Sequence, residues 1–113
     1  MKTALLIALL ALASPFAHAG GNAGAGEQKA KPCAACHGAD FNTSISADIP
    51  LLAGQYEDYL VRALADYKSG ARKNAVMDGQ ASALSAHDIR DIAAYISRLP
   101  GKLKVIPLHR LAQ

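Results

Sequence analysis

The segment Cys33-Ala34-Ala35-Cys36-His37 decides how the rest of this 113-residue chain is interpreted. It contains both cysteines of the sequence, and a histidine follows the second one directly. Cys-x-x-Cys-His is the pattern of c-type haem attachment. One helical turn brings the two thiols to the same edge of the ring, where each can form a thioether with a vinyl group. His37 then lies under the iron as its proximal ligand, which leaves one axial position to be filled from elsewhere.

Three other chemistries use the same residue types. A zinc site needs four ligands, and the spare histidines after the leader, His87 and His109, lack zinc-motif spacing. A thioredoxin-like dithiol needs a βαβ context that this alanine-rich, helix-patterned chain does not offer. A disulfide between Cys33 and Cys36 remains an alternative, because such bonds form in an oxidising compartment. Covalent attachment of one haem c per chain is the interpretation that the motif favours.

The first 19 residues predict a secretory signal peptide. Lys2 supplies a positive start, residues 5–13 are apolar, and Ala17-His18-Ala19 is a small-residue cleavage pattern. The apolar run is about half of the ~20 residues that a membrane span requires. We therefore expect cleavage after Ala19 and a periplasmic mature protein without a transmembrane segment, with an uncleaved anchor as the alternative.

The remaining length suffices for one small domain and not for two. We expect a flexible, glycine-rich leader over 20–25, the folded domain over 26–101 and a tail over 102–113. The apolar content is low, so the peptide should fold poorly until a haem completes its core. The formal net charge is only +3 and no basic stripe is interleaved with aromatics, which argues against nucleic acid as a partner.

Helical periodicity dominates the domain and predicts an all-α fold of about three to five helices around the haem. A first helix is expected over 27–36, where Pro32 either kinks it or forces a restart near Lys31. Loops are expected over 37–50 and over 70–84. A middle helix should end at Gly70 and bury one face. The residues of that face are Tyr56, Tyr59, Leu60, Ala63, Leu64 and Tyr67.

The last helix has the clearest boundaries. Ser85 is placed as its N-cap, with Asp88 three residues later as the partner in a capping box. Pro100-Gly101 ends it. Its apolar face consists of Ile89, Ile92, Ala93, Ile96 and Leu99.

The second axial ligand can be a methionine, another histidine or an open position. Met77 is the only methionine left after signal-peptide removal, and it falls between two apolar-faced helices, which favours a thioether ligand. A lone methionine is also common as core filler. His87 and His109 are the alternatives that would give a bis-histidine iron.

Three further residues are expected around the haem. Ligating histidines usually donate their second ring N–H to an oxygen acceptor, and the Pro50 carbonyl is our candidate for His37. Leu52 belongs to the apolar segment 51–54, which should line the proximal side. Tyr59 lies on the apolar face of the middle helix; such tyrosines are usually core residues and sometimes tune a cofactor.

The chain resembles the class I cytochromes c, and most of all their small bacterial periplasmic branch, which contains single-domain and tandem two-domain members. The resemblance covers roughly 26–99 and rests on CAACHGAD (33–40), IPLLAGQYEDYL (49–60), YKSGARKNAVM (67–77) and LSAHDIRDIAAYISRL (84–99). It implies covalent haem on Cys33 and Cys36, axial His37 and Met77, and a bracing Pro50.

The same resemblance implies that Gly26 of the first helix packs against Tyr95 of the last. Two features depart from the family. Phe41 replaces a common glycine, and the tail carries apolar residues that should either pack back onto the domain or dock on a partner subunit. These apolar residues are Leu103, Val105, Ile106, Leu108 and Leu111.

These features predict an electron carrier rather than an enzyme, with redox proteins as partners and no catalytic side chains of its own. One alternative is the haem subunit of a larger dehydrogenase, such as a flavoprotein that oxidises sulfide, with residues 102–113 holding the partner. Another is an open-site haem that senses gas or reacts with peroxide, which an available Met77 disfavours.

Overall fold

The computed structural model describes residues 20–103, which contain five α-helices and no strand. The all-α prediction is confirmed for this part of the chain. The predicted signal peptide and most of the predicted tail lie outside the described residues. The helices are α1 (Ala23–Lys29), α2 (Lys31–His37), α3 (Glu57–Ser69), α4 (Ala75–Ser82) and α5 (Ala86–Arg98).

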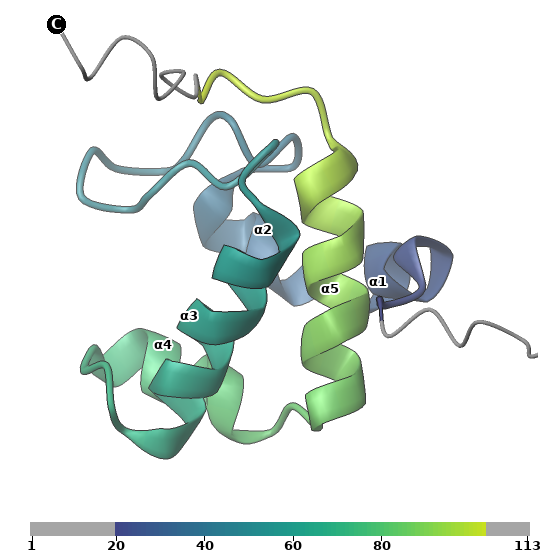
Figure 1. Cartoon of the computed structure of the whole chain (residues 1–113). Coiled ribbons are helices and arrows are strands. Elements are labelled where there is room, and N and C mark those ends of the chain that lie inside the picture. Colours follow the sequence, from purple (N-terminus) through teal and green to yellow (C-terminus); the bar gives the residue numbers. More distant parts are fainter. Residues whose placement is uncertain (1–19, 104–113) are drawn as a thin grey trace, which may run out of the picture.

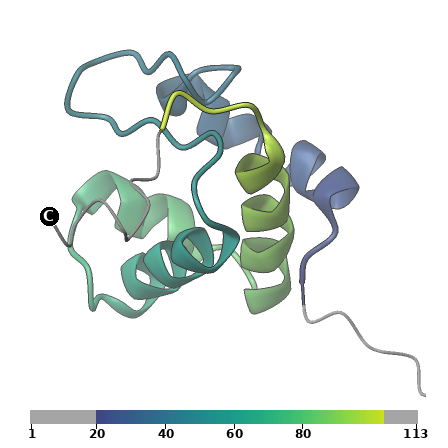
Figure 2. The same cartoon turned by 45° about the horizontal axis from the view of Figure 1, so that its top comes forward.

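The helix α5 is the centre of the packing. It lies between α1 on one side and α3 on the other, and α4 packs against α3 (Figures 1 and 2). A long loop, residues 38–56, follows α2 and runs close to residues 99–103, which leave α5 (Figure 1). The shared core consists of small and aliphatic side chains with one aromatic ring: Ala30, Phe41, Ala53, Leu60, Ile92, Ala93 and Ile96.

The first helical segment is divided in two. The α1 helix ends at Lys29 and α2 begins at Lys31, which confirms a restart at that residue. Pro32 lies in the first turn of α2, where its missing N–H costs no helical hydrogen bond. However, α1 begins at Ala23, capped by the Asn22 side chain, so part of the segment expected to be a flexible leader is helical.

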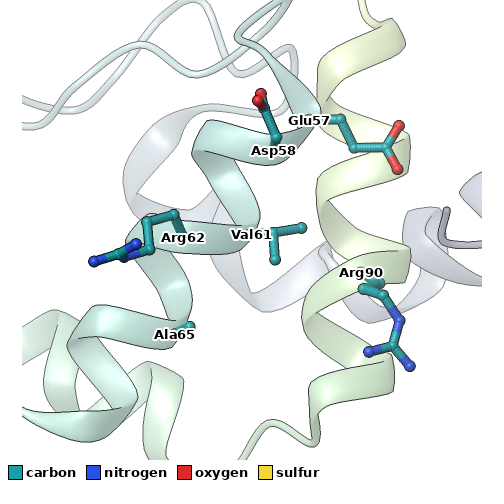
Figure 3. A pocket seen from close by; sticks show the side chains of 6 residues that line it. All are labelled: Glu57, Asp58, Val61, Arg62, Ala65 and Arg90. Carbon is teal, nitrogen blue, oxygen red and sulfur yellow. The ribbon is translucent and has the colours of Figure 1, made fainter. Parts of the chain in front are cut away.

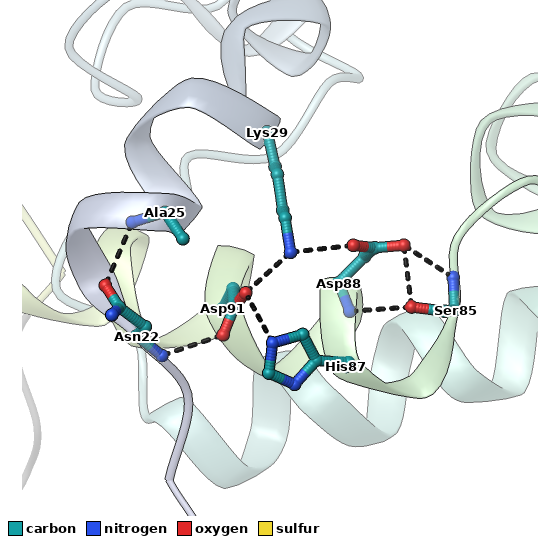
Figure 4. A network of polar contacts seen from close by, with 7 residues as sticks. All are labelled: Asn22, Ala25, Lys29, Ser85, His87, Asp88 and Asp91. Carbon is teal, nitrogen blue, oxygen red and sulfur yellow. Dashed lines mark hydrogen bonds and ion pairs between the residues drawn. The ribbon is translucent and has the colours of Figure 1, made fainter.

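A polar cluster joins α1 to α5 (Figure 4). The fully buried side chain of Asp91 accepts from the backbone N–H of Asn22 at 2.7 Å and from Lys29 Nζ at 2.6 Å. Lys29 Nζ also lies 2.8 Å from Asp88, and His87 Nε2 lies 3.3 Å from Asp91. Because each oxygen of the buried Asp91 carboxylate accepts a hydrogen bond, its charge is stabilised. The same contacts with Asn22 and Lys29 fix the short α1 on α5.

The α1 and α5 backbones approach each other closely at Gly26. A Cβ atom at this position would lie 1.9 Å from the Asp91 carbonyl oxygen and 2.9 Å from Tyr95 Cβ. Only glycine fits there without moving a helix. The expected packing of Gly26 against Tyr95 is confirmed.

The middle helix ends as predicted, with Gly70 in the left-handed conformation at its C-cap. Its buried face differs from the prediction. Leu60 is buried and Val61 and Leu64 pack against the core, because these residues face α5. Tyr56 and Tyr59 are 55% and 49% exposed. The buried stripe is therefore rotated towards Val61, and the expectation that both tyrosines are buried is wrong.

The expected loop over 70–84 is also wrong, because it contains α4. Asn74 opens this helix, and its side chain accepts from the backbone N–H groups of Val76 and Met77, both at 3.1 Å. The last helix confirms the prediction in detail, since the Ser85 and Asp88 capping box is present and Arg98 is its last residue. Caps of this kind satisfy N–H groups that have no partner inside the helix.

Candidate haem-binding site

The cysteine motif occupies most of α2. Cys33 and Cys36 are three residues apart on this helix, so their side chains lie on one face. Both are free thiols and half-buried. Burial raises the pKa of the Cys33 thiol, which keeps it protonated and uncharged at neutral pH. The two thiols are therefore presented together on one face of α2, with Cys33 packed against the core, as attachment to one ring edge requires.

His37 is the last residue of α2 and is 6% exposed. Its Nδ1 atom lies 2.8 Å from the Pro50 carbonyl oxygen, which is the contact expected from the sequence. Because a carbonyl can only accept, Nδ1 carries the hydrogen and the lone pair belongs to Nε2. No hydrogen bond to Nε2 is present within residues 20–103. The imidazole is thus oriented and in the tautomer that a metal ligand needs.

The loop after α2 is folded back onto that helix. The Ile45 N–H donates to the Cys36 carbonyl at 3.0 Å, and the N–H groups of Leu52 and Ala53 donate to the Phe41 carbonyl at 2.9 and 3.1 Å. Leu52 packs at the margin of the core. These bonds place the Pro50 carbonyl beside His37 and the apolar Leu52 next to α2.

Met77 lies in the first turn of α4, half-buried, and not in a loop as expected. The Asn74 cap fixes its backbone N–H. Sequence reasoning missed Asn74; the signal was an asparagine four residues before Asp78, whose Oδ1 accepts from the Asn74 N–H at 3.3 Å. Within the described residues α2 and α4 do not contact each other. A group ligated by both His37 and Met77 has to lie between these two helices.

Tyr59 lies on the exposed flank of α3, beside the connection to α4. Arg72 in this connection donates from Nη1 to the Tyr59 hydroxyl at 3.4 Å, and its guanidinium lies 4.9 Å from the centroid of the Tyr67 ring. The Tyr59 hydroxyl raises the pKa of the Arg72 guanidinium, which stays charged. The two tyrosines thus hold the α3–α4 connection by a hydrogen bond and a cation–π contact.

The remaining histidines do not reach this site in the described part of the chain. His87 is exposed and faces Asp91 in the α1–α5 cluster, and His109 lies outside the described residues. Across residues 20–103 no group of three His, Cys, Asp or Glu side chains is arranged to hold a metal ion. The zinc alternative therefore has no support among these residues.

A surface groove between α3 and α5 is distinct from the cysteine motif (Figure 3). It is lined by acidic and basic side chains and two small apolar ones, and neither His37 nor Met77 borders it. The lining residues are Glu57, Asp58, Val61, Arg62, Ala65 and Arg90.

The residues of α2 and α4 fit a covalently attached haem. Two free thiols lie one helical turn apart, and an oriented imidazole has its second nitrogen available. A half-buried thioether stands on a separate helix. This donor set of two thiols, one imidazole and one thioether matches c-type haem and does not match a zinc site.

Comparison with known proteins gives the same assignment. The Cytochrome c family model matches residues 23–100. Cytochrome c4 of Pseudomonas aeruginosa is 46% identical over 98 residues, covering 86% of this chain and 48% of that protein. A thiosulfate dehydrogenase electron acceptor of Thiomonas intermedia is 38% identical over 103 residues, covering 91% of this chain and 48% of that protein.

The fold agrees with a solved structure. Reduced recombinant cytochrome c4 of Pseudomonas stutzeri superposes with a TM-score of 0.68 at 42% identity, covering 74% of this chain and 48% of that one. The chain thus spans about half the length of these relatives. No helix among residues 20–103 has the length and apolar character needed to cross a membrane.

Proposed function

The chain belongs to the cytochrome c family of electron-transfer proteins, which bind haem c covalently, and on that premise we propose that it is a periplasmic carrier of single electrons with one haem. When bound, the haem supplies an iron that alternates between the ferric and ferrous states. Cys33 and Cys36 would attach the ring, and His37 and Met77 would hold its iron. The donor set on α2 and α4, together with the Pro50 contact of His37, carries this proposal.

The protein part of the mechanism begins with the proximal ligand. The Pro50 carbonyl accepts the Nδ1 hydrogen of His37, so the ring cannot rotate freely and Nε2 keeps its lone pair. This hydrogen bond also increases the electron donation of the imidazole. His37 is buried, so its side chain is largely shielded from water. The chain therefore offers a ligand that needs little reorganisation when the charge on the metal changes.

The methionine side completes the ligand set. A thioether is a soft, neutral ligand, and a His/Met pair gives a higher potential than a bis-histidine pair. Because Met77 stands in the first turn of a capped helix, its backbone position is fixed. Leu52 and Tyr59 are proposed as pocket residues, the former on the proximal side at the margin of the core and the latter beside the α3–α4 connection.

The periplasmic location rests on the signal-peptide pattern of residues 1–19. The proposed partners are redox proteins that donate and accept the electron, as an electron carrier requires. The low net charge argues against nucleic acid as a partner. Short-lived contacts of this kind bury little surface, below about 1,200 Å².

The test is the visible spectrum of the periplasmic holoprotein in both oxidation states. We expect a pyridine haemochrome of covalent c-type haem at one per chain, a thioether–iron band at the red end of the oxidised spectrum, and no carbon monoxide binding by the ferrous form. Met77→Ala should abolish the band and admit carbon monoxide. The matched control is Val76→Ala, an exposed neighbour on α4, which should keep the band. Survival of the band in Met77→Ala would refute the ligand assignment.

A second candidate is an electron acceptor that works with a dedicated dehydrogenase. The Thiomonas intermedia relative, named as such an acceptor for thiosulfate dehydrogenase, favours it. Purification at native expression levels separates the two: a stable complex with a dehydrogenase subunit supports the second candidate, and a monomer supports a freely diffusing carrier.

A further inference from the structure

Phe41 has a backbone conformation that is unusual for its residue type. Its φ angle is +55°, and it is the only non-glycine residue with positive φ among residues 20–103. A bulky side chain there is strained, and such strain persists only where surrounding contacts enforce it. A glycine at this place would adopt the conformation without strain. The contacts of the Phe41 side chain must therefore compensate for the strain in its backbone.

The Phe41 side chain is anchored in the core. It is 2% exposed and belongs to the same buried cluster as Ala53 and Ile96. Its ring packs edge-on against Tyr95 of α5, with the centroids 6.2 Å apart and the planes at 85°. Tyr95 lies where α1 and α5 approach most closely, next to Gly26. The ring thus ties the loop of residues 38–56 to the close contact between α1 and α5.

The Phe41 backbone reaches towards the haem ligand. Its carbonyl accepts from the N–H groups of both Leu52 and Ala53. These residues follow Pro50 closely, and the Pro50 carbonyl accepts from His37 Nδ1. A glycine in the same conformation could accept the same two hydrogen bonds, but it would lack the ring that fixes the carbonyl relative to α5.

We propose that Phe41 is a positioning residue for His37, and that its ring holds the Pro50 carbonyl in place through the 52–53 backbone. The inference rests on the proposed role of His37 as an axial ligand. Loss of the ring lets the 50–53 segment move and weakens the Nδ1 hydrogen bond. A less electron-donating imidazole stabilises the ferrous state, so the reduction potential rises.

The experiment compares Phe41→Ala, Phe41→Gly and Phe41→Leu as holoproteins. Exchange of the His37 Nδ1 proton is followed by NMR, and the reduction potential is measured in parallel. We expect Ala and Gly to accelerate exchange by about tenfold or more and to raise the potential. Leu retains most of the buried apolar volume and should restore both values towards those of the native protein. Native values in Phe41→Gly would overturn the proposal, because they would show that the backbone conformation alone suffices.

Two further variants separate positioning from general loss of stability. Ile89→Ala deletes a buried side chain of α5 that lies outside the Phe41 cluster. It should lower the melting temperature while leaving Nδ1 exchange and the reduction potential unchanged. Changes in exchange and potential as large as those of the Phe41 variants would overturn the proposal. Tyr95→Ala deletes the side chain against which the Phe41 ring packs and should accelerate Nδ1 exchange even if the Phe41 variants fail to fold. Unchanged exchange in Tyr95→Ala would also overturn the proposal.

A different result would refute the proposed function. If His37→Ala keeps the spectrum of an imidazole-ligated iron, His37 is not the ligand, whatever the Phe41 variants show. If His37→Ala loses that spectrum and the Phe41 variants match the native protein, only the positioning role is refuted.

Discussion

Gly26→Ala tests the close contact of α1 and α5 most directly. The added Cβ would lie 1.9 Å from the Asp91 carbonyl oxygen and 2.5 Å from the carbonyl carbon. Both atoms belong to the backbone of a central helix, so neither can rotate away as a side chain would. Ordinary contact at such a position begins at 3.4 Å. The two helices therefore have to separate by roughly 1.5 Å at this point, the difference between these distances.

The free-energy cost of overpacking at Gly26 is partly offset by the higher helix propensity of alanine. Overpacking a close-packed contact costs about 1–3 kcal/mol, and a backbone obstacle places this site at the upper end, near 3 kcal/mol. Alanine in place of glycine inside a helix returns about 1 kcal/mol. The net loss is therefore about 2 kcal/mol. For a domain of this size each kcal/mol changes the melting temperature by about 4–8 °C, so we expect a fall of about 8–16 °C.

Gly79→Ala is the matched control, because it makes the same change inside a helix without an obstacle. Gly79 lies in α4, and no heavy atom lies within 4 Å of its added Cβ. This variant should gain about 1 kcal/mol and melt about 4–8 °C higher. Thermal unfolding of the two holoproteins is followed by circular dichroism. A Gly26→Ala protein that melts at or above the native temperature would refute the close packing of α1 on α5.

The remaining predictions concern the α1–α5 ion cluster and the α4 cap. Lys29 lowers the pKa of both Asp88 and Asp91, and these carboxylates raise the pKa of Lys29. Their stabilisation is present above the unfolded carboxyl pKa of about 4, is lost as pH falls through the lowered values, and is lost again as pH rises above about 10.5. Melting temperature against pH should therefore fall at both ends, and Lys29→Met should flatten the profile. Asn74→Ala should cost about 1 kcal/mol and make Met77 easier to displace by added imidazole, whereas Asn74→Asp should keep the cap and the ligand.

Elements with explicit local signals were predictable from the sequence. The Ser85 capping box and the Gly70 stop both act within one helical turn, so residue type alone specifies them. The Pro50 contact of His37 was predictable for another reason. A ligating imidazole needs an acceptor for its second nitrogen, and the loop after the motif could supply one.

Features that depend on tertiary contacts were not predictable. The middle helix has two candidate apolar faces, and the choice between Tyr59 and Val61 as the buried side is made by its packing on α5. The helix α4 is short and contains Gly79, so its hydrophobic pattern is weak. Its N-cap residue, Asn74, is the clearest sequence signal for it. The positive φ of Phe41 has no local signal either, because it is imposed by the burial of its ring.

The two proposed axial ligands are held by different parts of the fold, and this has a mechanical consequence. His37 is linked through Pro50 and Phe41 to Tyr95, and so to α5, which also packs on α1 and α3. Met77 stands on α4, which among the five helices of residues 20–103 contacts only α3. The segment that holds His37 is thus as stable as the core. The position of Met77 depends on the contact of α4 with α3 and on the Asn74 cap. Local opening, and with it exchange of an axial ligand, should therefore begin at Met77 while His37 remains in place.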